Sequence, residues 1–243
     1  MDLAEYDRMD AAEDRLWWYR ALHANLADAW ARCGAGDGPV LDAGCGTGGW
    51  LRRLAPLAPG RTRIGLDRVE RAARRAREKA DAPVIVGDVG ALPFPDACFA
   101  AIFSADVLYH RDVEPRRALA EAFRCLVPGG VLLINVPAFD WLSSYHDRHV
   151  HGARRFTRGR LRTLLRESGF SPESVRYWNS LLFPLMVARR MRPGGAREGA
   201  SDVGQLAGWL DASLGAACTV ERAIGRLGVR WPAGGSVLAV ARK

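Results

Sequence analysis

Residues 40–49 of the chain read VLDAGCGTGG, and this stretch decides how the rest of the sequence is interpreted. A short apolar strand, Val40–Ala43, runs into a glycine-rich turn that opens a helix expected from Gly49 to about Ala58. Glycine permits positive φ and lets a ligand approach the backbone closely. The free N–H groups of a helix N-terminus also face such a turn. We therefore expect a ligand at the end of this strand.

Acidic residues at the ends of three strands indicate which kind of ligand. The spacing G-x-G-x-G-G departs from the dinucleotide pattern, and Asp42 would repel a pyrophosphate but attract an ammonium or sulfonium group. Asp67 ends a second strand, Arg63–Asp67, where an acid can accept both ribose hydroxyls. Asp88 ends a third strand, Pro83–Asp88, where it can accept an adenine amino group. The pattern predicts a cationic nucleoside and disfavours a nicotinamide dinucleotide.

Short apolar strands alternate with helices through the first half of the chain. This rhythm is typical of an α/β fold, which we expect to be a Rossmann-like three-layer sandwich. Its sheet should be seven-stranded and mostly parallel, with an antiparallel C-terminal strand, an N-terminal helix and a C-terminal helical insertion. The other expected elements are helices at Ala11–Cys33, Pro115–Leu126, Thr157–Ser168, Ser180–Met191 and Gln205–Leu227, an arginine-rich helix ending at Lys79, strands at Phe99–Ser104, Val131–Val136, Phe170–Trp178 and Gly235–Arg242, and a turn at Val127–Gly130.

We expect a single domain over residues 1–243, in three functional parts. Residues 1–38 form an N-terminal helical lid, residues 39–138 the cofactor-binding core, and residues 139–243 the substrate-side loop, helical insertion and final strands. The Pro/Gly-rich segment 192–204 is a candidate substrate lid.

Charge and composition restrict the partners. The net charge is +8, but 33 of the 35 basic residues are arginine, and the runs Arg71–Lys79 and Arg154–Arg166 are interleaved with Ala or Leu. Such runs are typical of solvated helix faces, so we expect no nucleic-acid partner, although attraction of anionic substrates stays open. No apolar run reaches the roughly 20 residues of a membrane span, and residues 1–15 do not resemble a signal peptide. We expect a cytoplasmic protein without stable membrane insertion.

Four separated motifs carry a family resemblance: VLDAGCGTGGW, IGLD, GDVGALPFPDACFAAIFSADVLYH and LVPGGVLLINVPA. Together they resemble the class I, seven-stranded S-adenosylmethionine-dependent methyltransferases over about Val40 to Ala138. The resemblance implies that the glycine turn surrounds the methionine moiety, with Asp42 nearby, and that Asp67 holds the ribose. The implied cofactor-binding residues of the core are Asp42, Gly44, Cys45, Gly46, Gly48, Asp67, Arg68, Asp88, Val89, Ser104 and Ala105.

Several of these residues also have a purely structural interpretation. Asp42 and Asp67 can cap helices, and Asp88 can serve an ordinary turn. Cys45 is expected to be there for its size and not for reactivity. The five cysteines are odd in number and contain no C-x-x-C pair, so neither a disulfide framework nor a structural zinc site is predicted.

The N-terminal run Leu16–Arg20, LWWYR, resembles the HWWYR segment of one bacterial subgroup of these enzymes. The stretches RRFT at 154–157 and WPAGGS at 231–236 strengthen that resemblance. Trp17 and Tyr19 can cover the cofactor, because a sulfonium lies well against an aromatic face, and Arg20 can pair with the methionine carboxylate. The alternative is a helix that packs its aromatic side chains into the core.

Histidines and tyrosines after the fourth and fifth strands mark the expected acceptor side. His110 and His146 are the candidate general bases, because histidine titrates near neutral pH. The candidate substrate-binding residues are Tyr109, Tyr145, His149 and Arg154. Alternatives are a supporting role for His110, a backbone bond for His146 and a surface position for Arg154. The spacing of His149 and His151 is not that of a helical zinc pair, and we expect no metal.

The sequence thus predicts a methyltransferase that acts on a small-molecule acceptor through oxygen, nitrogen or carbon, in specialised metabolism. Nucleic-acid amino methylation is disfavoured, because Ser104-Ala-Asp-Val lacks the proline-aromatic pocket for a flipped base. The alternative is a protein that binds S-adenosylmethionine without methyl transfer, as a cyclase or a regulator. The sequence carries no prediction of oligomeric state.

Overall fold

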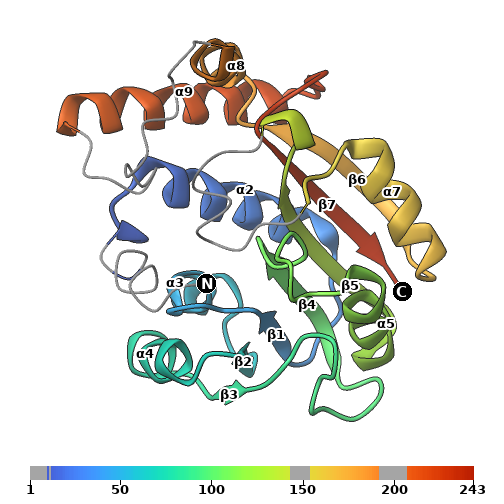
Figure 1. The fold of residues 1–243 in the computed structure, drawn as a ribbon. Helices are drawn as coiled ribbons and strands as arrows, with labels where there is room; N and C mark the ends of the chain where they lie inside the picture. Colours follow the sequence, from blue (N-terminus) through green and yellow to red (C-terminus); the bar gives the residue numbers. More distant parts are fainter. Residues whose placement is uncertain (1–9, 11, 143–153, 192–206) are drawn as a thin grey trace.

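The protein has a seven-stranded sheet, described here from a computed structural model that covers residues 10, 12–142, 154–191 and 207–243. The strand order is β3-β2-β1-β4-β5-β7-β6 (Figure 1). The first five strands run parallel, and β7 is antiparallel to both of its neighbours, β5 and β6. The strands are β1 (Val40–Ala43), β2 (Arg63–Asp67), β3 (Val84–Val86), β4 (Phe99–Ala105), β5 (Leu126–Pro137), β6 (Ser171–Trp178) and β7 (Ser236–Arg242). The predicted fold class is confirmed.

The parallel register brings the predicted ligand-binding residues to one edge of the sheet. Ala43 at the end of β1 pairs with Leu66 of β2, one residue before Asp67. Ala105 at the end of β4 pairs with Asn135 near the end of β5. Strand β1 is buried along its whole length, which fits the apolar residues on both sides of Asp42. The carboxyl ends of β1, β2, β4 and β5 therefore lie side by side.

Helices cover both faces of the sheet (Figure 1). On one face, side chains of α2 (Trp17–Cys33), α3 (Gly49–Arg53) and α9 (Gly208–Arg226) pack with Phe103, Leu133 and Leu238. On the other face, α5 (Pro115–Cys125) and α7 (Arg158–Glu167) pack on a second hydrophobic cluster, which includes Phe99, Ile102 and Leu132. Helix α4 (Glu70–Ala80) packs its alanines against the edge formed by β2 and β3, and α8 (Phe183–Met191) lies beside η2 (Asp140–Leu142).

Charged contacts fasten α9 to α2, although the two helices are almost 200 residues apart in sequence. Asp211 accepts hydrogen bonds from the Trp17 backbone N–H at 2.8 Å and from Arg20 Nη2 at 2.6 Å. Asp28, which is buried on α2, receives Arg226 Nη2 at 2.5 Å and Arg222 Nη1 at 3.4 Å. Because Asp211 satisfies an N–H group in the first turn of α2, it takes the place of a local cap.

Several element boundaries differ from the sequence prediction, and the three largest differences are described here. Helix α2 begins at Trp17 instead of Ala11, and the helix expected from Gly49 to Ala58 is divided into α3 and the 3-10 turn η1 (Ala55–Leu57), which contains Pro56. Strand β5 begins at Leu126 and continues through the expected turn at Val127–Gly130. The pairing of β4 with β5 shifts in register between Phe99 and Ala101, so residues 127–130 form a bulge in β5.

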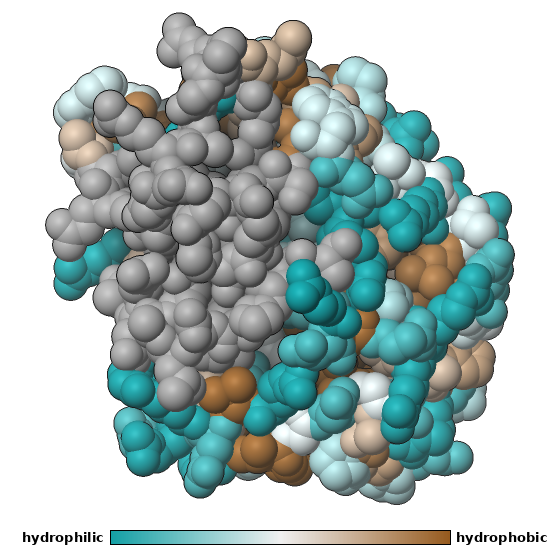
Figure 2. Space-filling view, in the orientation of Figure 1, coloured by the Kyte–Doolittle hydropathy of each residue, from teal (hydrophilic) through white to brown (hydrophobic). Residues whose placement is uncertain are grey.

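Hydrophilic side chains cover most of the visible surface over α5 and α7 (Figure 2). Several arginines there have acidic partners, including Arg116 with Glu167 and Arg160 with Asp140. No helix in the described part of the chain is long and apolar enough to cross a bilayer. Of the expected loop Phe139–His151, the candidate residues Tyr145, His146, His149 and His151 lie outside the described residues, as does the expected lid at 192–204.

The glycine turn gives a test of the fold. Gly48 has φ +92°, and a Cβ placed on it would lie 2.7 Å from Ala76 Cα of α4. Gly48→Ala should therefore lower the free energy of unfolding by about 2 kcal/mol or more, measured by urea denaturation. Gly36→Ala is the matched control, since no atom lies within 4 Å of its Cβ position. Equal stability of the two variants would contradict this packing.

Candidate cofactor and acceptor site

The glycine turn after β1 is packed between two neighbouring strands. The backbone N–H groups of Gly44 and Cys45 donate to Leu66 O at 2.7 and 2.9 Å, which joins the turn to β2. Gly44 has φ +86°, and a Cβ there would lie 2.3 Å from Val107 Cγ2 in the turn after β4. Only glycine fits this contact. Cys45 is buried, and burial raises the pKa of its thiol, which supports a packing role.

Asp42 is a buried carboxylate without a compensating positive charge in the described part of the chain. It is 2 % exposed, and its Oδ2 has no hydrogen-bond partner among the described residues. Burial, followed by the charges of Asp67 and Glu13, raises the pKa of Asp42 to about 8. An unpaired buried carboxylate is costly unless a cation or donor meets it. An ammonium group of a ligand satisfies this requirement, so the residue fits the predicted cofactor.

Asp67 and Asp88 combine local turn bonds with strand-end positions. Asp67 accepts the Gly46 N–H on Oδ2 and the Val69 N–H on Oδ1, each at 2.9 Å, so it connects the glycine turn to the start of α4. Each carboxylate oxygen has two lone pairs, so these bonds leave acceptor capacity for ribose hydroxyls. Asp88 Oδ1 accepts the Gly90 N–H at 2.7 Å, as in an ordinary turn. Their contacts with a nucleoside stay predictions.

The remaining predicted core residues lie around the same edge. Val89 and Ser104 both line a narrow, mostly apolar cavity between the sheet and α5, and Ala105 packs towards α2. Arg68 Nη1 lies 3.3 Å from Asp112 Oδ2, and this half-exposed ion pair connects the end of β2 to the loop after β4. These positions are compatible with the predicted cofactor contacts.

The N-terminal segment contributes a residue that the sequence analysis missed. Glu13 is buried, accepts the Thr47 hydroxyl at 2.8 Å and forms an ion pair with Lys79. A Cβ on Gly49 would lie 2.6 Å from Glu13 Oε2, so this carboxylate stands at the start of α3. Burial raises the pKa of Glu13, while Lys79 and Thr47 oppose the rise. A carboxylate at this point disfavours a pyrophosphate, which agrees with the expectation that the ligand is not a dinucleotide.

The aromatic run of α2 is divided between core packing and contacts with α9. The Trp18 ring lies 6.3 Å from that of Trp178, in the core. Trp17 also packs against this cluster, while Arg20 has its carboxylate partner in Asp211. The pairing of Arg20 with the methionine carboxylate, and the covering of the cofactor by Trp17, therefore stay predictions. The observed partner of Arg20 comes from α9, which the sequence alone did not indicate.

A chain of three polar groups at the ends of β4, β5 and β6 was also missed. Asp106 follows β4 and is held by its backbone N–H, which donates to Asn135 O at 2.9 Å. Asn135 Nδ2 donates to Asp106 Oδ1 at 3.0 Å, and Asn135 Oδ1 accepts Trp178 Nε1 at 2.7 Å. Burial raises the pKa of Asp106 to about 7, against the opposing effects of Asn135 and Arg155.

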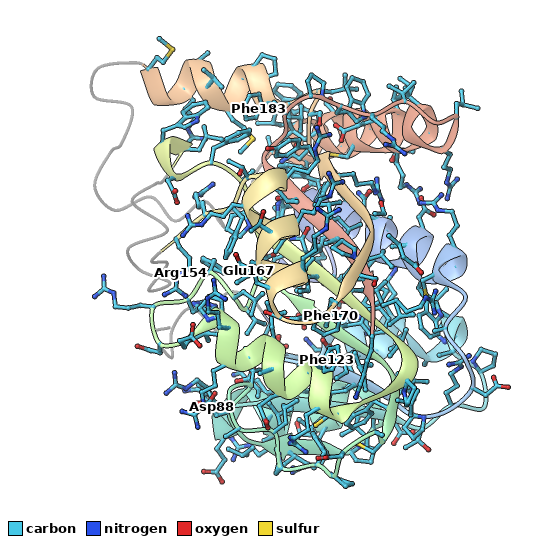
Figure 3. The ribbon with its side chains drawn as sticks, turned by 90° about the vertical axis from the view of Figure 1, so that its right-hand side faces the viewer. Asp88, Phe123, Arg154, Glu167, Phe170 and Phe183 are labelled. Carbon is cyan, nitrogen blue, oxygen red and sulfur yellow. The ribbon has the colours of Figure 1, made fainter. Side chains whose placement is uncertain are left out.

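Arg154 contacts the loop after β4, which carries Tyr109 and His110. The rings of Tyr109 and His110 lie 4.3 Å apart, and both residues are partly exposed. Arg154 Nη1 donates to the carbonyl oxygens of Leu108, His110 and Val113 at 3.2, 3.0 and 2.6 Å. Arg154 thus holds the backbone that carries Tyr109 and His110. Figure 3 places it along the same edge as Asp88 and Phe183. Direct substrate contacts of these residues stay predictions.

Aromatic rings gather beyond the end of β5. Phe139 stacks on Tyr177 of β6 with 5.3 Å between centroids, and it lies 5.5 Å from Phe183 at the start of α8. Trp141 lies 5.7 Å from Phe139 and is 58 % exposed. Phe139, Trp141, Tyr177 and Phe183 are called the aromatic cluster below. Among the described residues, no group of three His, Cys, Asp or Glu side chains is arranged to hold a metal ion.

Comparison with known proteins assigns the family. Residues 40–130 match the model of a methyltransferase domain. The chain is 31% identical over 169 residues to a "probable S-adenosylmethionine-dependent methyltransferase" of Mycolicibacterium smegmatis, covering 68% of this chain and 63% of that protein. The chain belongs to the class I S-adenosylmethionine-dependent methyltransferases. S-adenosylmethionine is therefore its cofactor, and the contact of Asp42 with the cation stays a prediction, supported by the absence of a hydrogen-bond partner for its Oδ2 among the described residues.

Two further relatives show how widely this family varies. A "probable tRNA methyltransferase 9B" of Bos taurus is 36% identical over 112 residues, which cover 45% of this chain and 23% of that protein. The solved structure of the [4+2]-cyclase SpnF has a TM-score of 0.61 and 25% identity, and the match covers 94% of this chain and 84% of that chain. The chain spans less than two thirds of the length of the curated relatives described here.

The raised pKa of Asp42 predicts proton release when the cofactor binds. At about pH 6.5 an acid with a pKa near 8 is protonated, and a bound cation should lower that pKa and expel about one proton. The ammonium of S-adenosylmethionine is itself protonated at that pH and contributes little. Calorimetry in buffers of different ionisation enthalpy measures the released proton. Asp42→Asn should abolish the release, and a wild type that releases none contradicts the assignment.

Asp67 gives a second prediction, for affinity. Asp67→Ala removes the ribose acceptor and frees the Gly46 N–H, so affinity for S-adenosylhomocysteine should fall by about 1.5–3 kcal/mol, or roughly 10- to 150-fold. Glu78→Ala, an exposed acid on α4, is the control and should bind as the wild type does. Unchanged affinity of the Asp67 variant in calorimetry would refute the ribose contact.

Proposed function

We propose that the protein transfers the methyl group of S-adenosylmethionine to a small-molecule acceptor, at oxygen, nitrogen or carbon, in specialised metabolism of the cytoplasm. S-adenosylmethionine supplies an activated methyl group with a good leaving group. The protein then needs mainly to align the acceptor and to exclude water. In this proposal Asp42 and Asp67 hold the cofactor, and the ends of β4, β5 and β6 receive the acceptor.

The observation that carries the proposal is the aromatic cluster beside the cofactor-binding edge. Phe139 follows β5, the neighbour of β4; its ring stacks on that of Tyr177 and makes a tilted contact with that of Phe183. Stacked aromatic rings suit an apolar or aromatic small molecule. The Asp106 carboxylate, at the end of the neighbouring strand β4, is a polar group on the same edge of the sheet. Such a composition supports a small acceptor.

The similarity to the probable tRNA methyltransferase does not indicate that this chain acts on tRNA. The match covers less than half of this chain and 23% of that protein, which leaves most of the relative without a counterpart. In the present chain Ser104-Ala-Asp-Val stands at the end of β4, without the proline-aromatic pocket expected for a flipped base. Arginines of α5 and α7 are also engaged by Glu167 and Asp140. We therefore favour a small molecule over nucleic acid.

A second candidate function is cofactor binding without methyl transfer. The similarity to the [4+2]-cyclase, over 94% of this chain at 25% identity, is the observation that favours it. A bound sulfonium can then act through its charge alone. Both candidates require the same Asp42 and Asp67, so only turnover separates them.

Turnover with a labelled methyl group tests these candidates together. The protein is incubated with S-adenosylmethionine carrying a tritiated methyl group, and with either a low-mass metabolite extract or bulk tRNA. We expect S-adenosylhomocysteine and label in the low-mass fraction. Label in tRNA would overturn the small-molecule proposal. Tight binding without any S-adenosylhomocysteine would favour the second candidate, and Asp67→Ala is the control for cofactor dependence.

A further inference from the structure

The end of β4 carries a carboxylate, Asp106, that is not among the predicted cofactor contacts. Asp106 has φ +55°, a left-handed conformation that costs energy for a residue other than glycine. As a residue it is partly exposed, yet its Oδ2 is buried and has no hydrogen-bond partner within the described part of the chain. Strain and an unsatisfied buried acceptor at one position indicate a group held ready for a ligand.

The direction of the unpaired oxygen is fixed by donors on the neighbouring strands. The indole N–H of Trp178 can only donate, so the side-chain oxygen of Asn135 must face it. The amide NH₂ of Asn135 then faces Asp106 and binds Oδ1 at 3.0 Å. Asn135 is fully buried and Trp178 is 1 % exposed, so neither can turn freely. The arrangement uses Oδ1 for positioning and leaves Oδ2 for another molecule.

We propose that Asp106 receives the acceptor, binding its O–H or N–H group through Oδ2 and taking the proton during methyl transfer. The inference rests on the proposed function and names its acceptor class: a hydroxyl or an amine. The acceptor's O–H or N–H bond breaks as its new bond to the methyl carbon forms. The proton goes to Oδ2, and the electron pair of the broken sulfur–carbon bond stays on sulfur. A negative carboxylate and a positive sulfonium thus become two neutral groups.

The electrostatics of the position suit this task. Burial raises the pKa of Asp106 to about 7, and the charge of Arg155, from the segment before α7, limits the rise. Asn135 of β5 faces the carboxylate as a neutral donor and also limits the rise. A base is most effective when its pKa lies near the working pH. His110, four residues further along, instead packs its ring on Tyr109, and Arg154 binds its carbonyl.

A titration tests the proposal without any acceptor. Because Asn135 links Asp106 to Trp178, the indole N–H signal of Trp178 should shift with pH, with a midpoint near 7. NMR of isotopically labelled protein measures the shift, and Trp178→Phe assigns the signal. Asp106→Asn should abolish the titration. A Trp178 signal that does not titrate near neutral pH, or that titrates unchanged in the variant, overturns the proposal.

Binding and rate measurements separate this role from cofactor binding. Asp106→Asn should keep the affinity for S-adenosylhomocysteine within about threefold and lower the single-turnover rate by about 100-fold or more. The probe is the low-mass extract with the tritiated cofactor. The wild-type rate should rise with pH up to about 7, because the ionised carboxylate is the active form, and the variant should lose this dependence. Asp96→Asn, whose side chain is 78% exposed, is the matched control and should change neither quantity.

The outcomes distinguish the two proposals. A wild type that makes no S-adenosylhomocysteine refutes the proposed function, while the Trp178 titration still reports on Asp106. An Asp106→Asn variant with wild-type turnover refutes the role of Asp106 alone. A loss of more than tenfold in cofactor affinity would assign Asp106 to the cofactor and also overturn the inference. His110→Gln should keep the neutral pH dependence if Asp106 is the base.

Discussion

The burial of negative charge where parallel strands end is the constraint on which the site depends. Asp42 has no room to be solvated, because β1 lies between β2 and β4 and is buried along its length. Asp67 and Glu13 add further negative charge around it. A low-dielectric edge with this charge excludes anions strongly and favours a cation. The electrostatics of the sheet edge thus agree with a sulfonium cofactor, in line with the predicted contacts of Asp42 and Asp67.

The segments that surround this edge are positioned by charged contacts over long sequence distances. Glu13 joins the N-terminal segment to Thr47 and Lys79, and Asp211 joins α9 to the first turn of α2. On the opposite side of the site, Arg154 binds three carbonyl groups of the loop after β4. These contacts arrange parts of the chain with no regular strand pairing to position them. The parallel strands form the edge at which we predict the cofactor, and these contacts position the segments around that edge.

The sequence predicted well both the sheet and which strand ends lie side by side, because both depend on local patterns. An apolar strand followed by glycines identifies a strand-to-helix turn, and parallel topology brings strand ends together. The neighbouring positions of Asp42 and Asp67 therefore follow from the sequence alone. Glu13 and the partner of Arg20 could not be predicted, because side-chain pairing across 34 and 191 residues depends on how helices pack. The start of β5 was missed because a bulge and a turn share the same Pro-Gly-Gly signal.

In the proposed mechanism, Asp42 and Asp106 are similar carboxylates to which their neighbours give different tasks. Both are raised in pKa by burial, but Asp42 is affected further by negative Asp67 and Glu13, whereas Asp106 faces Arg155 and the amide of Asn135. The first environment needs a permanent cation to become favourable, which suits binding. The second tolerates either protonation state near neutral pH, which suits proton transfer. If the proton moves to Asp106 as the sulfonium charge disappears, the site's total charge stays constant. No uncompensated charge then has to be created in a water-poor site.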